Sequence, residues 1–165
     1  MTDPESTRAG RARALLWMTA TALLAGLALA AGYALRPLIS PDAALSAPVN
    51  TSCDLSAGPC ASGLPGRGRI ILSVEPRGIP VLQPLEISVR VEGLQAQDAS
   101  VDFVGVNMDM GLNRAPLEPD GQGRFTGRGM LPVCARSRMV WDARVLVQTP
   151  EGLASAPFRF ETHRP

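Results

Sequence analysis

The chain has 165 residues, of which 45% are hydrophobic and 4% aromatic, and its 16 basic and 15 acidic residues leave a net charge of +1. This balance excludes a strongly basic nucleic-acid surface, so we expect no nucleic-acid partner. The sequence also lacks a Cys-x-x-Cys pair, a Gly-x-Ser-x-Gly elbow and a phosphate-binding glycine loop. Its single histidine has no evident nucleophile to activate, so we predict no enzymatic activity and no catalytic residues.

The first element is an uncharged stretch from Ala14 to Leu35. A bilayer core needs roughly 20 apolar residues in helical form, so the sequence predicts a transmembrane helix over residues 14–35 that makes the lipid bilayer a partner. Arginines crowd residues 1–13, whereas only Arg36 follows the far end. This asymmetry predicts a cytoplasmic N-terminus. All basic residues are arginine, a bias that is common in GC-rich bacterial genomes. We therefore expect a protein of the bacterial inner membrane whose C-terminal domain lies in the periplasm.

A cleavable signal peptide is the alternative interpretation of the same stretch. The triplets at residues 28–30 and 32–34 resemble small-residue cleavage sites that follow a positively charged segment. The uncharged run is longer than the roughly 7 to 15 residues of a signal-peptide core, which favours a retained anchor. Both interpretations export the same domain.

Residues 36–68 are rich in proline, alanine, serine and glycine. Such a segment has little apolar surface to bury and favours extended conformers. The composition therefore predicts a linker between the membrane helix and a folded domain.

The rest of the chain, residues 69–163, has the period-two pattern of β-strands. Apolar and polar residues alternate from Leu85 to Glu92 and again from Met139 to Gln148. Shorter strand candidates lie at residues 70–75, 101–110, 124–130 and 154–161. Six or seven short antiparallel strands in about 100 residues predict an all-β domain with the fold of an immunoglobulin-like β-sandwich.

Sulfur is the only unusual local chemistry in this domain. The candidate metal ligands are Met108, Met110, Cys134 and Met139. Thioether and thiolate ligands are soft and select Cu(I) over harder ions. In the strand expected at residues 101–110, Met108 and Met110 would point to the same side and could share one ion. The sequence therefore predicts Cu(I) as a possible cofactor.

Core packing is the alternative explanation for these methionines, because methionine commonly fills irregular gaps in a core. The expected order of strands raises a geometric objection as well. In a plain meander of the strands at residues 101–110, 124–130 and 139–147, Met108 and Met110 lie at the opposite end of the sheet from Met139. A crossover within residues 111–123 would remove the objection, although the sequence does not require one.

The chain contains three cysteines, an odd number, so at least one thiol is unpaired within the monomer. Cys53 and Cys60 flank a six-residue loop and form one candidate disulfide, which would leave Cys134 free. The competing arrangement joins Cys53 or Cys60 to Cys134 and removes Cys134 as a ligand. The spacing of the cysteines does not distinguish between these two disulfide arrangements.

The segments Met108-Asp109-Met110-Gly111, Gly123 to Gly127, Leu131-Pro132 and the strand opened by Trp141 resemble the FixH/YtkA-like family over approximately residues 85–161. The resemblance implies a periplasmic immunoglobulin-like domain tethered by one N-terminal helix. It implies metal-side roles for Met108 and Met110 and a structural role for Trp141. Our own inference is that Cys134 takes a ligand role here, because no histidine accompanies the methionine pair.

Two functions follow as expectations. In the first, which the resemblance implies, the protein is a membrane-anchored periplasmic accessory protein that holds Cu(I) and assists copper delivery or the assembly of a membrane complex such as a haem-copper oxidase. In the second, it is a metal-free β-sandwich adaptor that docks on a larger membrane complex.

Overall fold

The computed structural model describes residues 17–33, 43–66 and 68–163. The chain divides into two compact units, Met1–Asp42 and Ala43–Pro165. In the first unit, residues 17–33 form a helix. The expected cytoplasmic segment, residues 1–13, and the ends of the expected span lie outside the described residues. Within the described part of the chain, no helix is both long and apolar enough for a bilayer crossing.

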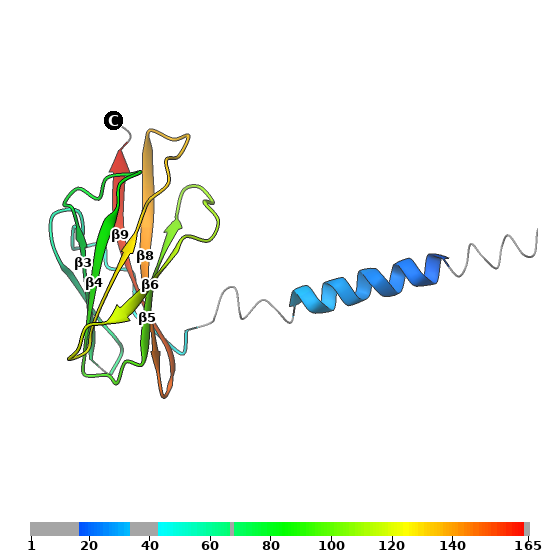
Figure 1. The fold of residues 1–165 in the computed structure, drawn as a ribbon, viewed down its shortest axis with the longest axis horizontal. Helices are drawn as coiled ribbons and strands as arrows, with labels where there is room; N and C mark the ends of the chain where they lie inside the picture. The colour runs from blue at the N-terminus through cyan, green and yellow to red at the C-terminus, as the bar shows by residue number, and fades with distance from the viewer. Residues whose placement is uncertain (1–16, 34–42, 67, 164–165) are drawn as a thin grey trace, which may run out of the picture. The chain divides into compact units, whose positions relative to one another are not determined.

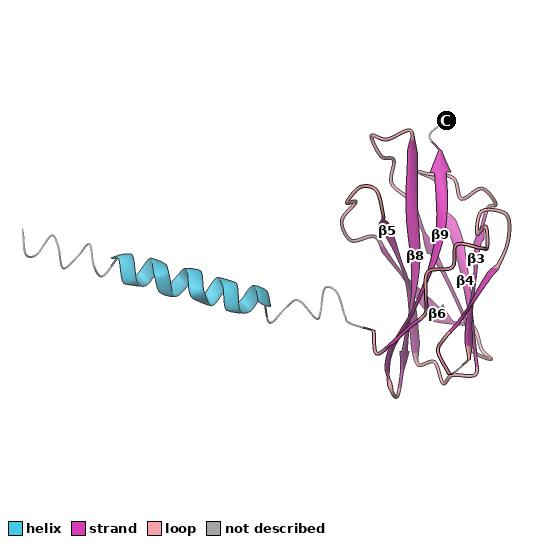
Figure 2. Ribbon diagram, turned by 180° about the vertical axis from the view of Figure 1, so that it is seen from behind, coloured by secondary structure: helices cyan, strands magenta, loops and turns pink. Residues whose placement is uncertain are grey.

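The second unit is built from strands, which confirms the all-β prediction for this domain (Figure 1; Figure 2). Its nine strands are β1 (Leu45–Ser46), β2 (Cys60–Gly63), β3 (Arg69–Glu75), β4 (Leu85–Glu92), β5 (Asp98–Gly105), β6 (Arg114–Pro119), β7 (Arg124–Gly129), β8 (Arg138–Thr149) and β9 (Gly152–His163).

The nine strands form one curled sheet in the order β1-β9-β8-β5-β6-β7-β4-β3-β2. All neighbours are antiparallel except β1 and β9. Strand β6 joins the two halves, because its first residues pair with β5 and its last two pair with β7. Asn50 links the two ends of the sheet. Its backbone bridges to Phe158 of β9, and its side-chain amide donates to the carbonyl of Ala61 in β2 at 2.7 Å.

The core lies inside the curl and follows from the alternation seen in the sequence. In β4, Leu85, Ile87, Val89 and Val91 are buried, while the residues between them are exposed or half-buried. Trp141 of β8 is fully buried, and its indole N–H donates to the hydroxyl of Thr162 at 3.0 Å. Because a buried indole needs such a partner, Trp141 has the structural role that the resemblance implied.

The structure corrects the expected linker boundary. We predicted a linker through residue 68, but residues 43–66 belong to the folded unit: β1 and β2 extend the two ends of the sheet, and Leu55 is fully buried. Pairing with the sheet edges satisfies the backbone of a segment whose composition alone favours an extended chain.

The second correction concerns the strand expected at residues 101–110. It ends at Gly105, and an additional strand, β6, follows at residues 114–119. The extra strand reverses the direction of every later strand relative to β5, so β8 runs antiparallel to β5 and Gly105 pairs with Trp141. The end of β5 and the start of β8 therefore lie at the same end of the sheet, which removes the geometric objection raised above.

Candidate metal site

The site is built on the loop of residues 106–113, which connects β5 to β6. Two asparagines fasten the loop to its neighbours. The Asn107 amide donates to the carbonyl of Arg138 at 3.3 Å and accepts from the backbone N–H of Val140 at 3.1 Å. At the other end, the Asn113 amide donates to the carbonyl of Met130 at 3.1 Å. The loop is thereby held against the start of β8 and the end of β7.

Three of the four predicted sulfur residues meet beneath this loop. The Cys134 thiol donates to the Met110 sulfur at an Sγ–Sδ distance of 3.2 Å. A Cβ placed on Gly105 would lie 2.6 Å from Met139 Cε and 3.1 Å from Met110 Cγ. Met110 and Met139 therefore both pack closely against Gly105. One side chain comes from the β5–β6 loop, one from the segment before β8 and one from β8 itself.

Glycine is required at position 105 because of the backbone that crosses it. The carbonyl oxygen of Met108 lies so close to Gly105 that a Cβ would overlap it. Such close approach of two backbone segments is a recurrent use of glycine in strands. The sequence signal, Val104-Gly105-Val106 at the end of an apolar strand, was available but was not used in our prediction.

Met108 is not part of the buried group. Its side chain is 37% exposed, whereas Met139 and Cys134 are 2% and 9% exposed. The expectation that Met108 and Met110 share one face of a strand is wrong, because both lie in the loop. Met108 is thus placed at the surface of the same loop that carries Met110.

The buried position of Cys134 controls its protonation. Burial raises the pKa of the Cys134 thiol above its ordinary value, because desolvation penalises the thiolate. The thiol is therefore protonated at neutral pH. Binding of a metal ion to this sulfur would displace the proton, so affinity would increase with pH.

The donor set fits a soft monovalent ion. Two thioethers and one thiol offer sulfur ligands only, the type that Cu(I) prefers. Among the described residues, no group of three or more His, Cys, Asp or Glu side chains could hold a metal ion. A cavity of about 10 Å³, room for at most one water-sized group, lies beside Cys134 and Met139, and Met110 does not line it.

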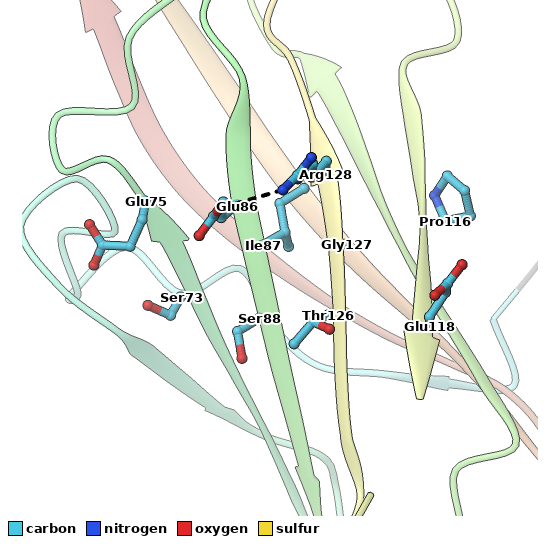
Figure 3. A pocket seen from close by; sticks show the side chains of 10 residues that line it. All are labelled: Ser73, Glu75, Glu86, Ile87, Ser88, Pro116, Glu118, Thr126, Gly127 and Arg128. Carbon is cyan, nitrogen blue, oxygen red and sulfur yellow. Dashed lines mark ion pairs between the residues drawn. The ribbon is translucent and has the colours of Figure 1, made fainter. Parts of the chain in front are cut away.

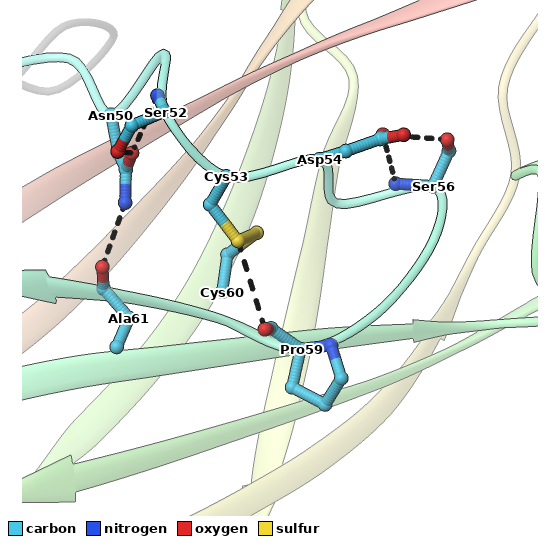
Figure 4. Close-up of a disulfide and its surroundings, with 8 residues drawn as sticks. All are labelled: Asn50, Ser52, Cys53, Asp54, Ser56, Pro59, Cys60 and Ala61. Carbon is cyan, nitrogen blue, oxygen red and sulfur yellow. Dashed lines mark hydrogen bonds between the residues drawn. A yellow bond between two sulfur atoms is a disulfide. The ribbon is translucent and has the colours of Figure 1, made fainter.

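Of the two arrangements left open by the sequence, the disulfide between Cys53 and Cys60 is present (Figure 4). Their Cα atoms are 5.8 Å apart, within the usual range for a disulfide. Cys134 is free and buried. The arrangement that joins Cys134 to one of the other cysteines is therefore not formed. Inside the loop, Asp54 accepts hydrogen bonds from the backbone N–H and the hydroxyl of Ser56, and these bonds lower its pKa.

A separate groove of about 680 Å³ lies on the outer face of β3, β4, β6 and β7 (Figure 3). Ser73, Ser88, Thr126 and Glu118 are successive cross-strand partners that form one polar row across it. A second row contains Glu75, Glu86 and Arg128. None of the predicted sulfur residues lines this groove.

Comparison of the chain with protein-family models, with curated proteins and with solved structures finds no significant match.

Proposed function

We propose that this chain is a membrane-anchored accessory protein of the bacterial periplasm that holds Cu(I) through Met110, Cys134 and Met139. Met108, exposed on the same loop, is the ligand through which the ion enters and leaves. The protein delivers copper to a membrane complex such as a haem-copper oxidase. The observation that carries the proposal is the sulfur–sulfur distance of 3.2 Å between Cys134 and Met110, beside the buried Met139.

The domain is proposed to be an immunoglobulin-like β-sandwich. Support comes from the way β6 divides the sheet into two halves, one with β1, β9, β8 and β5 and the other with β7, β4, β3 and β2. Inward-facing side chains of both halves form one core. In the proposed sandwich, these two halves would be the two layers, joined by β6.

Export and anchoring rest on two further observations. The Cys53–Cys60 disulfide is typical of a protein that folds in an oxidising compartment. In the helix at residues 17–33, the Thr21 hydroxyl donates to the carbonyls of Trp17 and Met18, each at 3.0 Å. This pairing within the helix satisfies a hydroxyl that would otherwise lack a partner in hydrocarbon. We therefore propose residues 14–35 as the anchor.

Anaerobic titration with Cu(I), in competition with a colorimetric Cu(I) chelator, tests the proposal. Residues 43–165 are the fragment to use, because they form the folded unit. We expect one Cu(I) per chain and a copper X-ray absorption spectrum with sulfur as the only neighbour. A Met110→Leu/Met139→Leu variant should bind at least about tenfold more weakly, because loss of even an outer partner of a metal ligand has an effect of that size.

The matched control is Met130→Leu. Met130 is 51% exposed and lies outside the sulfur group formed by Met110, Cys134 and Met139, so this variant should bind Cu(I) as the unmodified fragment does. Equal affinity in the double variant and the control, or no bound copper at all, would reject the metal site.

The second candidate function is the metal-free adaptor, and the burial of the same residues favours it. Met139 is part of the hydrophobic core, and Met110 packs against it. Methionines that fill gaps in a hydrophobic core commonly occupy such positions. In that case the copper titration gives no specific binding, while the double variant retains the interaction with the membrane complex.

A further inference from the structure

The methionines of the β domain differ in their access to solvent. Met108 and Met130 are exposed, Met110 is half-buried and Met139 is buried. Peroxides convert methionine to its sulfoxide, provided that the oxidant reaches the sulfur. The structure therefore separates two accessible methionines from two protected ones, and Met108 is the accessible methionine on the loop that carries Met110.

The backbone of Met108 lies beside the sulfur group of Met110, Cys134 and Met139, although its side chain faces solvent. The Met108 carbonyl oxygen packs against Gly105, and a Cβ on Gly105 would lie 2.6 Å from Met139 Cε and 3.1 Å from Met110 Cγ. Methionine has three rotatable side-chain bonds and adapts its shape to its surroundings. A side chain that begins at position 108 is thus long and flexible enough to carry its sulfur between solvent and the sulfur group.

The surroundings of Met108 tolerate its oxidation. Hydrogen bonds from Asn107 and Asn113 fasten both ends of the loop, and neither bond involves the Met108 side chain. A sulfoxide oxygen at this exposed position remains hydrated. At the buried Met139, the same oxygen would lack a partner, which costs free energy. Oxidation at Met108 therefore leaves the fold in place.

Cys134 is the other oxidisable sulfur near this loop, and it is protected in two ways. Its side chain is buried, which limits the access of an oxidant. Burial also raises the pKa of the thiol, and a protonated thiol is a much weaker nucleophile than a thiolate. An oxidant from solvent consequently reacts with Met108 before it reacts with the sulfur atoms that hold the ion.

We propose that Met108 is a site of reversible oxidation and that its sulfoxide closes the route by which Cu(I) enters and leaves the sulfur group. The inference rests on the proposed function, because it assigns the regulation of the same site. The oxidant is a peroxide. The O–O bond breaks as an S–O bond forms, the Met108 sulfur loses two electrons, and the peroxide is reduced to water when hydrogen peroxide is the oxidant.

The sulfoxide changes the ligand that the ion meets first. It presents a hard oxygen in place of the thioether sulfur, whereas Cu(I) prefers soft sulfur ligands. The three ligands that hold the ion are unaltered. Because Met108 contacts the ion only during exchange, its oxidation should slow binding and release equally and leave the equilibrium affinity unchanged.

Oxidation of the full chain in detergent, followed by peptide mapping with mass spectrometry, tests the first half of the proposal. The metal-free protein is treated with increasing hydrogen peroxide. We expect sulfoxide at Met108 and Met130 at the lowest doses. Met110, Met139 and Cys134 should remain unmodified until the protein is unfolded, because burial protects them.

Copper exchange in two matched variants tests the second half. Met130→Leu removes the other accessible methionine of the β domain, and Met108→Leu removes the proposed site. Release of Cu(I) to a colorimetric chelator is followed over time, before and after peroxide treatment of the metal-free chain. In Met130→Leu, oxidation should slow release at least about tenfold, the size of effect that follows loss of a partner of a metal ligand. Treatment with methionine sulfoxide reductases and a thiol should restore the rate.

Met108→Leu is the control that cannot form a sulfoxide at this position. Its release of Cu(I) should already be slow, and peroxide should not change the rate further. Its equilibrium affinity for Cu(I) should match that of Met130→Leu, since neither side chain belongs to the group that holds the ion.

The outcomes distinguish this inference from the proposed function. The inference alone is overturned if Cu(I) binds but peroxide leaves the release rate of Met130→Leu unchanged, or if Met108→Leu responds to peroxide equally. Oxidation of Met110 or Met139 together with Met108, or a loss of equilibrium affinity on oxidation of Met108, also overturns it. Absence of Cu(I) binding in the untreated chain overturns the proposed function and this inference with it.

Discussion

The sulfur of Cys134 lies 3.2 Å from the sulfur of Met110, although 24 positions separate the two residues in the chain. The contact exists because the loop before β6 and the segment before β8 both lie at the end of the sheet where β5 finishes. It places a thiol beside a thioether next to the core.

The Cys134 thiol should be slow to react in the folded protein. Burial limits access and raises the pKa of the thiol, so little thiolate forms at neutral pH. With a chromogenic disulfide reagent and no reductant, we expect one reactive thiol per unfolded chain. In the folded protein, this thiol should react with the reagent at a rate at least about tenfold lower. Three thiols, or equal rates in the two states, would contradict the cysteine arrangement described above.

Replacement of Gly105 by alanine should destabilise the domain and disturb the sulfur group. The added Cβ overlaps the Met108 carbonyl and lies 2.6 Å from Met139 Cε, so the loop must move. Overpacking of this kind destabilises a protein by about 1–3 kcal/mol, which urea unfolding would measure. Gly63→Ala is the matched control, because no atom lies within 4 Å of its added Cβ. An equal effect of the two substitutions would refute the close approach at Gly105.

Loss of the Cys53–Cys60 disulfide should lower the free energy of unfolding by about 2–3 kcal/mol, the chain-entropy value for so short a loop. Reduction of the native protein and a Cys53→Ser/Cys60→Ser variant should agree, as measured by urea unfolding. Because the disulfide is remote in sequence from the sulfur group, Cu(I) stoichiometry should stay unchanged. A variant as stable as the oxidised protein would show that the loop is held by other contacts.

The ion pair between Arg138 and Glu161 should make stability depend on pH in the acid range. Hydrogen bonds from Arg138, with Nε at 2.7 Å, hold the pKa of Glu161 below its ordinary value of 4.5. The pKa of Glu161 is thus lower in the folded state than in the unfolded state. The contribution of the ion pair to stability is therefore complete above about pH 4.5 and is lost as the pH falls through the folded-state pKa.

A Glu161→Gln variant should therefore show a smaller decrease in stability between about pH 6 and pH 3 than the unmodified protein, as measured by thermal unfolding. Glu118→Gln, at an exposed carboxylate of β6, is the control and should keep the full decrease. Identical pH profiles for Glu161→Gln and the unmodified protein would show that the ion pair does not persist in solution.

A fragment that starts at residue 43 should fold, whereas one that starts at residue 66 should be much less stable. The shorter fragment lacks β1, β2 and the buried side chains of Leu55 and Cys60. Full burial of one leucine contributes about 1.5–3 kcal/mol, so the loss is a large part of the stability of a small domain. Circular dichroism with urea titration measures the difference. Equal stability would restore the linker boundary that we expected from composition.

Local pattern was sufficient for the strands with strict alternation. From Leu85 to Glu92 and from Met139 to Gln148, the face that the pattern marks as apolar is buried, although Asp142 and Leu146 on the other face of β8 are buried as well. The pattern failed for β6, because Pro116 and Pro119 in a six-residue strand do not resemble a sheet interior. Strand β6 lies at the crossing between the two halves of the sheet, and this position explains why it tolerates proline.

The sequence alone determined that an uncharged N-terminal segment precedes an all-β domain, that sulfur residues cluster between positions 108 and 139, and that one cysteine must remain unpaired. These features depend on composition, on local periodicity and on the odd number of cysteines. Only the tertiary structure decided which cysteine is free, that residues 43–66 belong to the domain and that Met110, Cys134 and Met139 meet while Met108 faces outward. The physical reason is that such contacts depend on the direction of each strand in the sheet, and one additional short strand reverses it for all that follow.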